Sequence, residues 1–145
     1  MRRDGFASVS IGPYLQPGVL VTRPAQFSGD KTAMFVNVGG ADARRLTVSV
    51  LDAATEQPLP GLASGKIDQQ GVRVQVAFEG GASALAKAGG TPVRVKFYLP
   101  AGANDAQLFS FWLADDSCGA SNGWVAAGGP GFNASRDLCG SCRCQ

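Results

Sequence analysis

Acid–base chemistry in this sequence would fall to carboxylates, because the 145 residues contain no histidine. The absence of histidine removes the commonest general base, the usual Ser and Cys triads and the standard zinc hydrolase sites. A glycosidase needs two carboxylates that face each other across a cleft. The eleven acidic residues fall mostly in expected turns, and only Asp115 and Asp116 are adjacent in the chain.

The Asp115–Asp116 pair has the only suggestive spacing of carboxylates. Neighbours on an extended chain point to opposite sides, so the two side chains do not converge easily on one bond. We therefore expect a solvated turn at a strand end, with a weak calcium site as the alternative. The sequence predicts no catalytic residue, no resident metal and no cofactor.

All four cysteines lie in the last 29 residues, a Gly-rich segment without a convincing strand: Cys118, Cys139, Cys142 and Cys144. In an oxidising compartment they would form two disulfides, and closing the loop from Cys118 is worth about 3 kcal/mol. The alternative is a four-thiolate zinc site, because Cys139 and Cys142 have zinc-knuckle spacing, although the other two cysteines do not form a second such pair. The tripeptide that begins at Asn133 fits a glycosylation acceptor, which favours a secretory or extracellular location.

Aromatic and basic side chains offer a second kind of chemistry, the binding of sugars. Carbohydrate-binding sandwiches stack pyranose rings on exposed aromatic rings and bind the hydroxyls with nearby polar groups. Aromatic residues in a sandwich more often belong to the core or to a contact between domains, and this alternative stays open. The candidates for a sugar platform are Tyr98, Trp112, Arg94 and Lys96, with Trp124 and Tyr14 as possible extensions.

Composition limits the classes of partner. The chain is long enough for one domain with its own core. Thirteen basic and eleven acidic residues nearly cancel, and the basic residues are scattered, so nucleic-acid binding is not expected. No apolar run is long enough to span a bilayer, and the first residues do not resemble a signal peptide. The chain is therefore expected to be either not secreted on its own or preceded by further sequence.

The elements that must position these side chains are mostly strands. Short apolar runs are separated by clusters of Gly, Pro and Asp. The only helical segment is Ala82–Ala88, which ends at a pair of glycines in the position of a C-cap. Strands are predicted over residues 6–11, 19–22, 32–38, 46–51, 72–78, 90–100 and 105–114.

Most of these strands alternate apolar and polar residues, which is typical of a strand with one face in a core. In residues 93–99, for example, Val93, Val95 and Phe97 alternate with Arg94 and Lys96. About seven one-sided strands in a chain of this length favour two antiparallel sheets packed face to face. We predict an all-β, jelly-roll-like sandwich over residues 1–116 and an irregular Cys- and Gly-rich tail over residues 117–145.

The segment 107–114 is the exception, because it is apolar on both sides. Strict alternation places Phe109, Phe111 and Leu113 on one face and Leu108 and Trp112 on the other. An apolar outer face usually marks a place where another molecule or domain docks. The sequence therefore predicts a docking surface that includes Leu108 and Trp112.

Several short motifs, in order, resemble the C-terminal β-sandwich module of proteins related to family 32 and family 43 glycoside hydrolases and to sialidase-like five-bladed propellers. Each motif alone is ordinary strand-and-turn chemistry, and together they cover about residues 2–114. They begin with the RRDGFASV opening and continue through TRPAQF, MFVNV, LTVSVLD, PLPGL, SALA, PVRVKFYL and AQLFSF.

The resemblance implies a non-catalytic accessory domain, since the propeller of that family carries the catalytic carboxylates and the sandwich packs against it. Its expected partner is a glycan or a catalytic propeller domain. Only Met1 precedes the opening motif, where the family has its last propeller blade, which suggests a detached or truncated module. Two functions follow: a carbohydrate-associated module that binds glycan, or a structural domain that packs on a propeller or another subunit without a ligand.

Overall fold

The computed structural model describes residues 7–12 and 16–119. Within them the chain forms strands in the order that the sequence predicts, with one short strand and one 3-10 turn that it does not predict. The elements are β1 Gly18–Val21, β2 Ala33–Gly39, η1 Ala43–Arg45, β3 Thr47–Asp52, β4 Gly65–Lys66, β5 Gly71–Gln75, α1 Gly81–Ala88, β6 Val93–Leu99 and β7 Gln107–Ala114.

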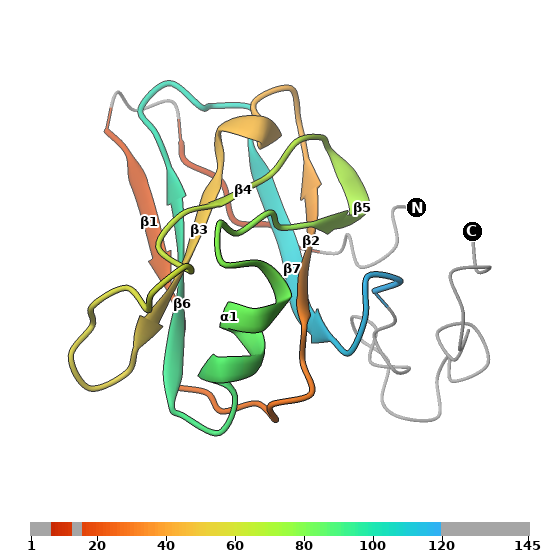
Figure 1. The fold of residues 1–145 in the computed structure, drawn as a ribbon. Helices are drawn as coiled ribbons and strands as arrows, with labels where there is room; N and C mark the ends of the chain where they lie inside the picture. The colour runs from red at the N-terminus through yellow and green to blue at the C-terminus, as the bar shows by residue number, and fades with distance from the viewer. Residues whose placement is uncertain (1–6, 13–15, 120–145) are drawn as a thin grey trace.

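The strands form two antiparallel sheets, which confirms the predicted all-β sandwich. Sheet 1 has the order β1-β6-β3-β4 and sheet 2 has the order β5-β2-β7 (Figure 1). Among the described strands, β3 and β4 are the only consecutive pair that lies in one sheet. Every other connection crosses between the sheets, as in a jelly roll.

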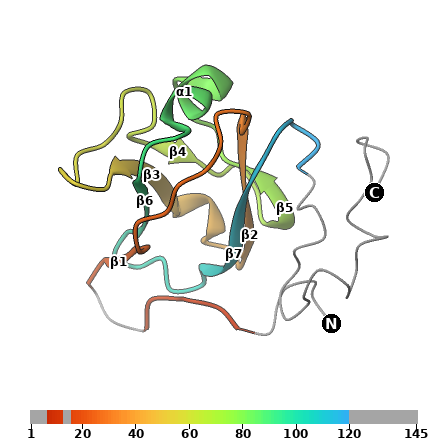
Figure 2. The same cartoon turned by 90° about the horizontal axis from the view of Figure 1, so that it is seen from below.

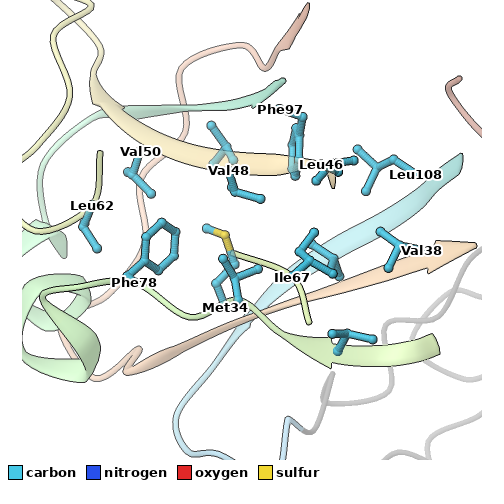
Figure 3. Packing of buried hydrophobic residues seen from close by; sticks show 14 of the residues in the cluster. Met34, Val38, Leu46, Val48, Val50, Leu62, Ile67, Phe78, Phe97 and Leu108 are labelled. Carbon is cyan, nitrogen blue, oxygen red and sulfur yellow. The ribbon is translucent and has the colours of Figure 1, made fainter. Parts of the chain in front are cut away.

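The core lies between the two sheets, and strand alternation builds it. On β6, Val93, Val95 and Phe97 point inward and are almost completely buried, as the sequence predicts. Phe97 packs near Leu46, which directly precedes β3, and Val48 of β3, and it faces residues of sheet 2 (Figure 3). Burying aliphatic and aromatic side chains in this way is the main force that stabilises such a domain.

A β-bulge in β7 overturns the predicted faces of that strand at one residue. Asn37 of β2 pairs with Ser110, but the next residue, Val38, pairs with Leu108, so Phe109 is an extra residue. One extra residue reverses the side on which earlier side chains emerge. Leu108 therefore points into the core and is only 4% exposed, and its assignment to an outer docking face was wrong (Figure 3).

The predicted strand over residues 72–78 divides between the two sheets. Its first part is β5, which pairs with β2 in sheet 2. Ala77 then forms a bridge to Lys66 of β4, in sheet 1. The sequence pattern continues through the crossing because Val74, Val76 and Phe78 are all buried in the same core.

Two short segments close the sandwich. The predicted N-terminal strand is described from residue 7, and there it forms only a bridge, between Val9 and Leu108 at the edge of β7. Helix α1, which the sequence placed within one residue, lies beside the two sheets rather than between the strands of either (Figure 2). It packs Leu85 and Ala88 onto the core.

Helix α1 is the only α-helix of the described chain, and no helix there is long and apolar enough to cross a membrane.

Candidate functional site

The outer face of sheet 1 carries three of the predicted sugar-binding residues. Alternation along β6 places Arg94, Lys96 and Tyr98 on the side opposite the core. Tyr98 is 37% exposed, whereas Arg94 and Lys96 are half-buried. The structure thus brings these three residues together on one strand, with Lys96 about 7 Å along the strand from Tyr98.

Neighbouring strands extend this face. Tyr98 pairs with Val19 of β1 on one side and with Thr47 of β3 on the other. In the next row, Lys96 lies between Val21 and Ser49. We call the set Val19, Val21, Thr47, Ser49, Lys96 and Tyr98 the Tyr98 face.

Val19 and Val21 are functional candidates that the sequence did not single out. They are 57% and 42% exposed, among the most exposed large apolar side chains of the described chain. The signal was present as the alternation of Val19, Leu20 and Val21, but alternation alone does not say which face points outward. The pairing of Leu20 with the buried Phe97 decides it.

Lys96 is available for a ligand, whereas Arg94 is already engaged. No ion pair joins Lys96 to any acidic residue of the described chain. The Arg94 guanidinium donates from Nη1 to the Thr22 carbonyl at 3.0 Å, and its Nε lies 3.7 Å from Oε1 of Glu56. Arg94 therefore holds the β1 end to β6 and has less freedom to bind a hydroxyl or carboxylate.

Trp112 lies on the outer face of sheet 2, away from Tyr98. Its ring stacks on Phe35, with ring centroids 5.7 Å apart and an interplanar angle of 17°. Its Nε1–H donates to the carbonyl of Gly119 at 3.0 Å. The structure does not bring Trp112 and Tyr98 into one platform, because they belong to opposite layers of the sandwich.

The outer face of sheet 2 is covered by the chain itself around Phe35, whereas Gln75, which pairs with Phe35 from β5, stays exposed. Gly119 lies so close to Phe35 that a Cβ at residue 119 would be 2.7 Å from the Phe35 ring. Phe35 is 3% exposed and Asn37, next to it on the same face, is fully buried. The predicted open docking surface around Trp112 is therefore a second, smaller packing cluster that comprises Ala33, Phe35, Trp112 and Ala114.

Asp115 and Asp116 act separately at the end of β7. The Asp115 carboxylate pairs with the Lys31 ammonium and accepts its hydrogen bond, which raises the pKa of Lys31. The Asp115 carbonyl accepts a hydrogen bond from the Thr32 hydroxyl at 2.5 Å, and Asp116 accepts one from the Cys118 N–H at 2.9 Å. Across residues 7–12 and 16–119, no group of three His, Cys, Asp or Glu side chains is placed to hold a metal ion.

The remaining predicted site residues lie outside the described residues. These are Tyr14, Trp124, Asn133 and the cysteines Cys139, Cys142 and Cys144. Cys118 is described, but its three candidate partners are not, so disulfide pairing and the zinc alternative both stay predictions. The division of the chain at residue 116 also stays a prediction.

No family model matches the chain, and neither a curated protein nor a solved structure does. The resemblance to glycosidase accessory modules therefore depends on the sequence motifs alone and stays a prediction.

Proposed function

We propose that this chain is a non-catalytic β-sandwich module of a glycosidase-like protein and that it contacts glycan through the Tyr98 face. The observation that supports the proposal is the exposure of Tyr98 beside Lys96 and Val19, on the outer face of sheet 1. An aromatic ring on an open face suits the apolar side of a pyranose.

The Tyr98 face has the chemical parts of a shallow sugar site. The Tyr98 ring and the Val19 methyl groups offer an apolar surface, while the Lys96 ammonium can donate to a hydroxyl or to a uronic carboxylate one row away. The site is flat and has one ring, so we expect a dissociation constant of about 1 mM, equivalent to about −4 kcal/mol.

The experiment compares binding of the full chain to a panel of neutral and acidic oligosaccharides with binding of two variants. Tyr98→Phe retains the ring and should bind within about threefold of the natural chain. Tyr98→Ala removes the ring and should lose about five- to tenfold in affinity, because an aromatic contact of this kind contributes about 1 to 1.4 kcal/mol. Equal binding by Tyr98→Ala and the natural chain, or no binding to any member of the panel, contradicts glycan contact at this face.

A second candidate function is docking against a protein domain, such as a catalytic propeller. The observation that favours it is the exposure of Val21 in addition to Val19, because the sugar contact proposed above uses only Val19. The variant Val21→Ser separates the two functions. Glycan contact through Tyr98 and Val19 should survive this change, whereas protein docking should weaken more than tenfold.

We also propose that the four cysteines pair in an oxidising compartment. Their confinement to one terminal segment and the neighbouring Asn133 acceptor support this. Titration of free thiols in denaturant, with and without prior reduction, should find none before reduction and four after it. Four free thiols together with one bound zinc ion would favour the zinc site instead.

A further inference from the structure

A cavity of about 370 Å³ lies beside helix α1, on a part of the molecule that the proposed glycan contact does not use. One wall is the turn that contains Leu59 and Pro60, and the other is the exposed side of α1. Its volume is near the lower end of the range for small-molecule sites, about 300 to 1,000 Å³. The lining residues are Leu59, Pro60, Gly80, Ser83, Ala84, Lys87, Ala88 and Thr91.

The two walls are fixed against each other by a contact between two glycines. The Gly80 N–H donates to the Gly61 carbonyl at 2.9 Å. A Cβ on Gly61 would lie 2.8 Å from the Gly80 Cα, so neither residue leaves room for a side chain. Gly61 also has a φ of 75°, which L side chains rarely adopt. The wall formed by the turn is therefore held in place before any ligand binds.

The far end of α1 is held in a similar way. Gly89 follows the helix, and a Cβ there would lie 2.4 Å from the Cα of Gly29. The Gly90 N–H donates to the Phe27 carbonyl at 2.7 Å. Because both ends of α1 are anchored to neighbouring loops, the helix wall is also preformed, which lowers the cost of ordering on binding.

The lining combines an apolar floor with a single charge. Leu59, Pro60, Ala84 and Ala88 are apolar, and no acidic side chain lines the cavity. Lys87 lies on α1 and makes no ion pair with any acidic residue in the part of the chain that the structure describes. The cavity therefore has a net positive charge and nothing of its own to neutralise it.

Two hydroxyl groups accompany this charge. Ser83 precedes Lys87 by four residues, so the two side chains share one face of the helix. Thr91, four residues after Lys87, also lines the cavity. One ammonium and two hydroxyls beside an apolar floor match a ligand with a compact apolar body and one anionic group.

We propose that this cavity binds a small organic carboxylate, with the apolar body against Leu59 and Ala84 and the carboxylate on Lys87. None of the lining residues belongs to the Tyr98 face, so this site is independent of the glycan contact, and the two proposals are tested separately. Apolar contact supplies most of the affinity, and Lys87 selects the charge of the ligand.

The test is a titration of the full chain, followed by heteronuclear NMR, with three probes that share one ring: benzoate, benzyl alcohol and benzylamine. Benzoate should shift the amide signals of α1 and of the turn at Leu59. It should bind about tenfold more tightly than benzyl alcohol, since a hydrogen bond to a charged group is worth about one order of magnitude in affinity. Benzylamine should bind most weakly.

Charge reversal provides the decisive variant. Lys87→Glu should weaken benzoate about tenfold or more and should make benzylamine the preferred probe. Lys66→Glu is the matched control, because Lys66 is an exposed lysine on β4 that does not line the cavity. It should leave the preference for benzoate unchanged.

A helix can be weakened by a negative charge in its last turn, so the variants are also compared by circular dichroism. Lys87→Gln keeps good helix propensity and should bind benzoate and benzyl alcohol equally. Absence of benzoate binding, shifts confined to residues far from α1, or an unchanged order of probes in folded Lys87→Gln would each overturn the proposal.

Discussion

The two outer faces of this sandwich carry similar apolar and aromatic residues, but the chain covers these residues on one face and leaves them exposed on the other. On sheet 2, Trp112 stacks on Phe35 and is bonded to Gly119, so its own chain covers the face. On sheet 1, Tyr98 and Val19 remain exposed, and no described segment lies over them. An aromatic residue on an outward strand position therefore does not by itself mark a binding surface.

The two faces are expected to serve different purposes: the covered face stabilises the fold, and the open face is available to contact a partner. Residues on the covered face should contribute to the free energy of unfolding, because their substitution opens a packed cluster. Residues on the open face should contribute little to it and are available for recognition. The following predictions test each side of this difference, from the largest expected effect to the smallest.

Leu108→Ala should lower the free energy of unfolding by about 3 kcal/mol, since Leu108 is almost fully buried in the core as a result of the bulge. Urea denaturation measures the change. Val72→Ala, at a 43% exposed position of β5, the other edge strand of sheet 2, is the control and should cost less than about 0.5 kcal/mol. If Leu108→Ala lowers the free energy of unfolding no more than Val72→Ala does, Leu108 lies on the outer face and not in the core.

Trp112→Ala should lower the free energy of unfolding by about 2 kcal/mol, less than a fully buried tryptophan because Trp112 is half-buried. Trp112→Phe keeps an aromatic ring on Phe35 but loses the N–H donor to Gly119, and should cost about 1 kcal/mol. Both are measured by denaturant unfolding. If neither substitution changes the unfolding midpoint, the outer face of sheet 2 is not part of the packed structure.

Gly119→Ala should cost more than Gly90→Ala by about 1 to 2 kcal/mol of unfolding free energy. Both glycines have positive φ, 69° and 81°, so each substitution strains the backbone. Only at Gly119 does the added methyl group meet the Phe35 ring, whereas at Gly90 nothing lies within 4 Å. Thermal or urea unfolding of the pair isolates that contact, and equal losses would show that Gly119 does not cover Phe35.

The pH dependence of stability should differ slightly at the ends of the two sheets. Hydrogen bonds from the Thr55 backbone and hydroxyl and from the Ala54 N–H lower the pKa of Asp52, at the end of β3. This contribution is present above the ordinary pKa of 3.8 and is lost as pH falls below it.

Beside the start of β2 and the end of β7, stability is expected to change with pH in the opposite direction. The raised pKa of Lys31 means that its pairing with Asp115 stabilises the fold fully below pH 10.5 and is lost as pH rises through the higher native value. Urea midpoints measured against pH should show a small acid loss that Asp52→Asn removes and a small alkaline loss that Lys31→Gln removes. An unchanged acid profile in Asp52→Asn would contradict the role of the turn.

Local patterns predicted most of the fold. Alternation located the inward residues of β3 and β6, and the glycine pair located the end of α1. The bulge in β7 was not predicted because it depends on pairing with β2. From residue 108 to residue 114 every position except Ser110 is apolar, so the alternation of apolar and polar residues that would reveal a change of face is absent.

The candidate site was predicted in part for a related reason. Tyr98 and Lys96 share a face through alternation within one strand, which the sequence shows directly. Trp112 was grouped with them although it lies on the other sheet, since assignment of strands to sheets depends on contacts between distant residues. The cavity beside α1 was not foreseen, because its walls meet through the Gly61–Gly80 contact.

The difference between the two faces is tested most directly by one NMR titration of the full chain with an oligosaccharide that it binds. The signals of Tyr98, Lys96 and Val19 should shift together, while the indole N–H of Trp112 stays in place because it is bonded to Gly119. A shift of the Trp112 indole with a silent Tyr98 ring would contradict the account, since it would make the covered face the binding surface and the open face inert.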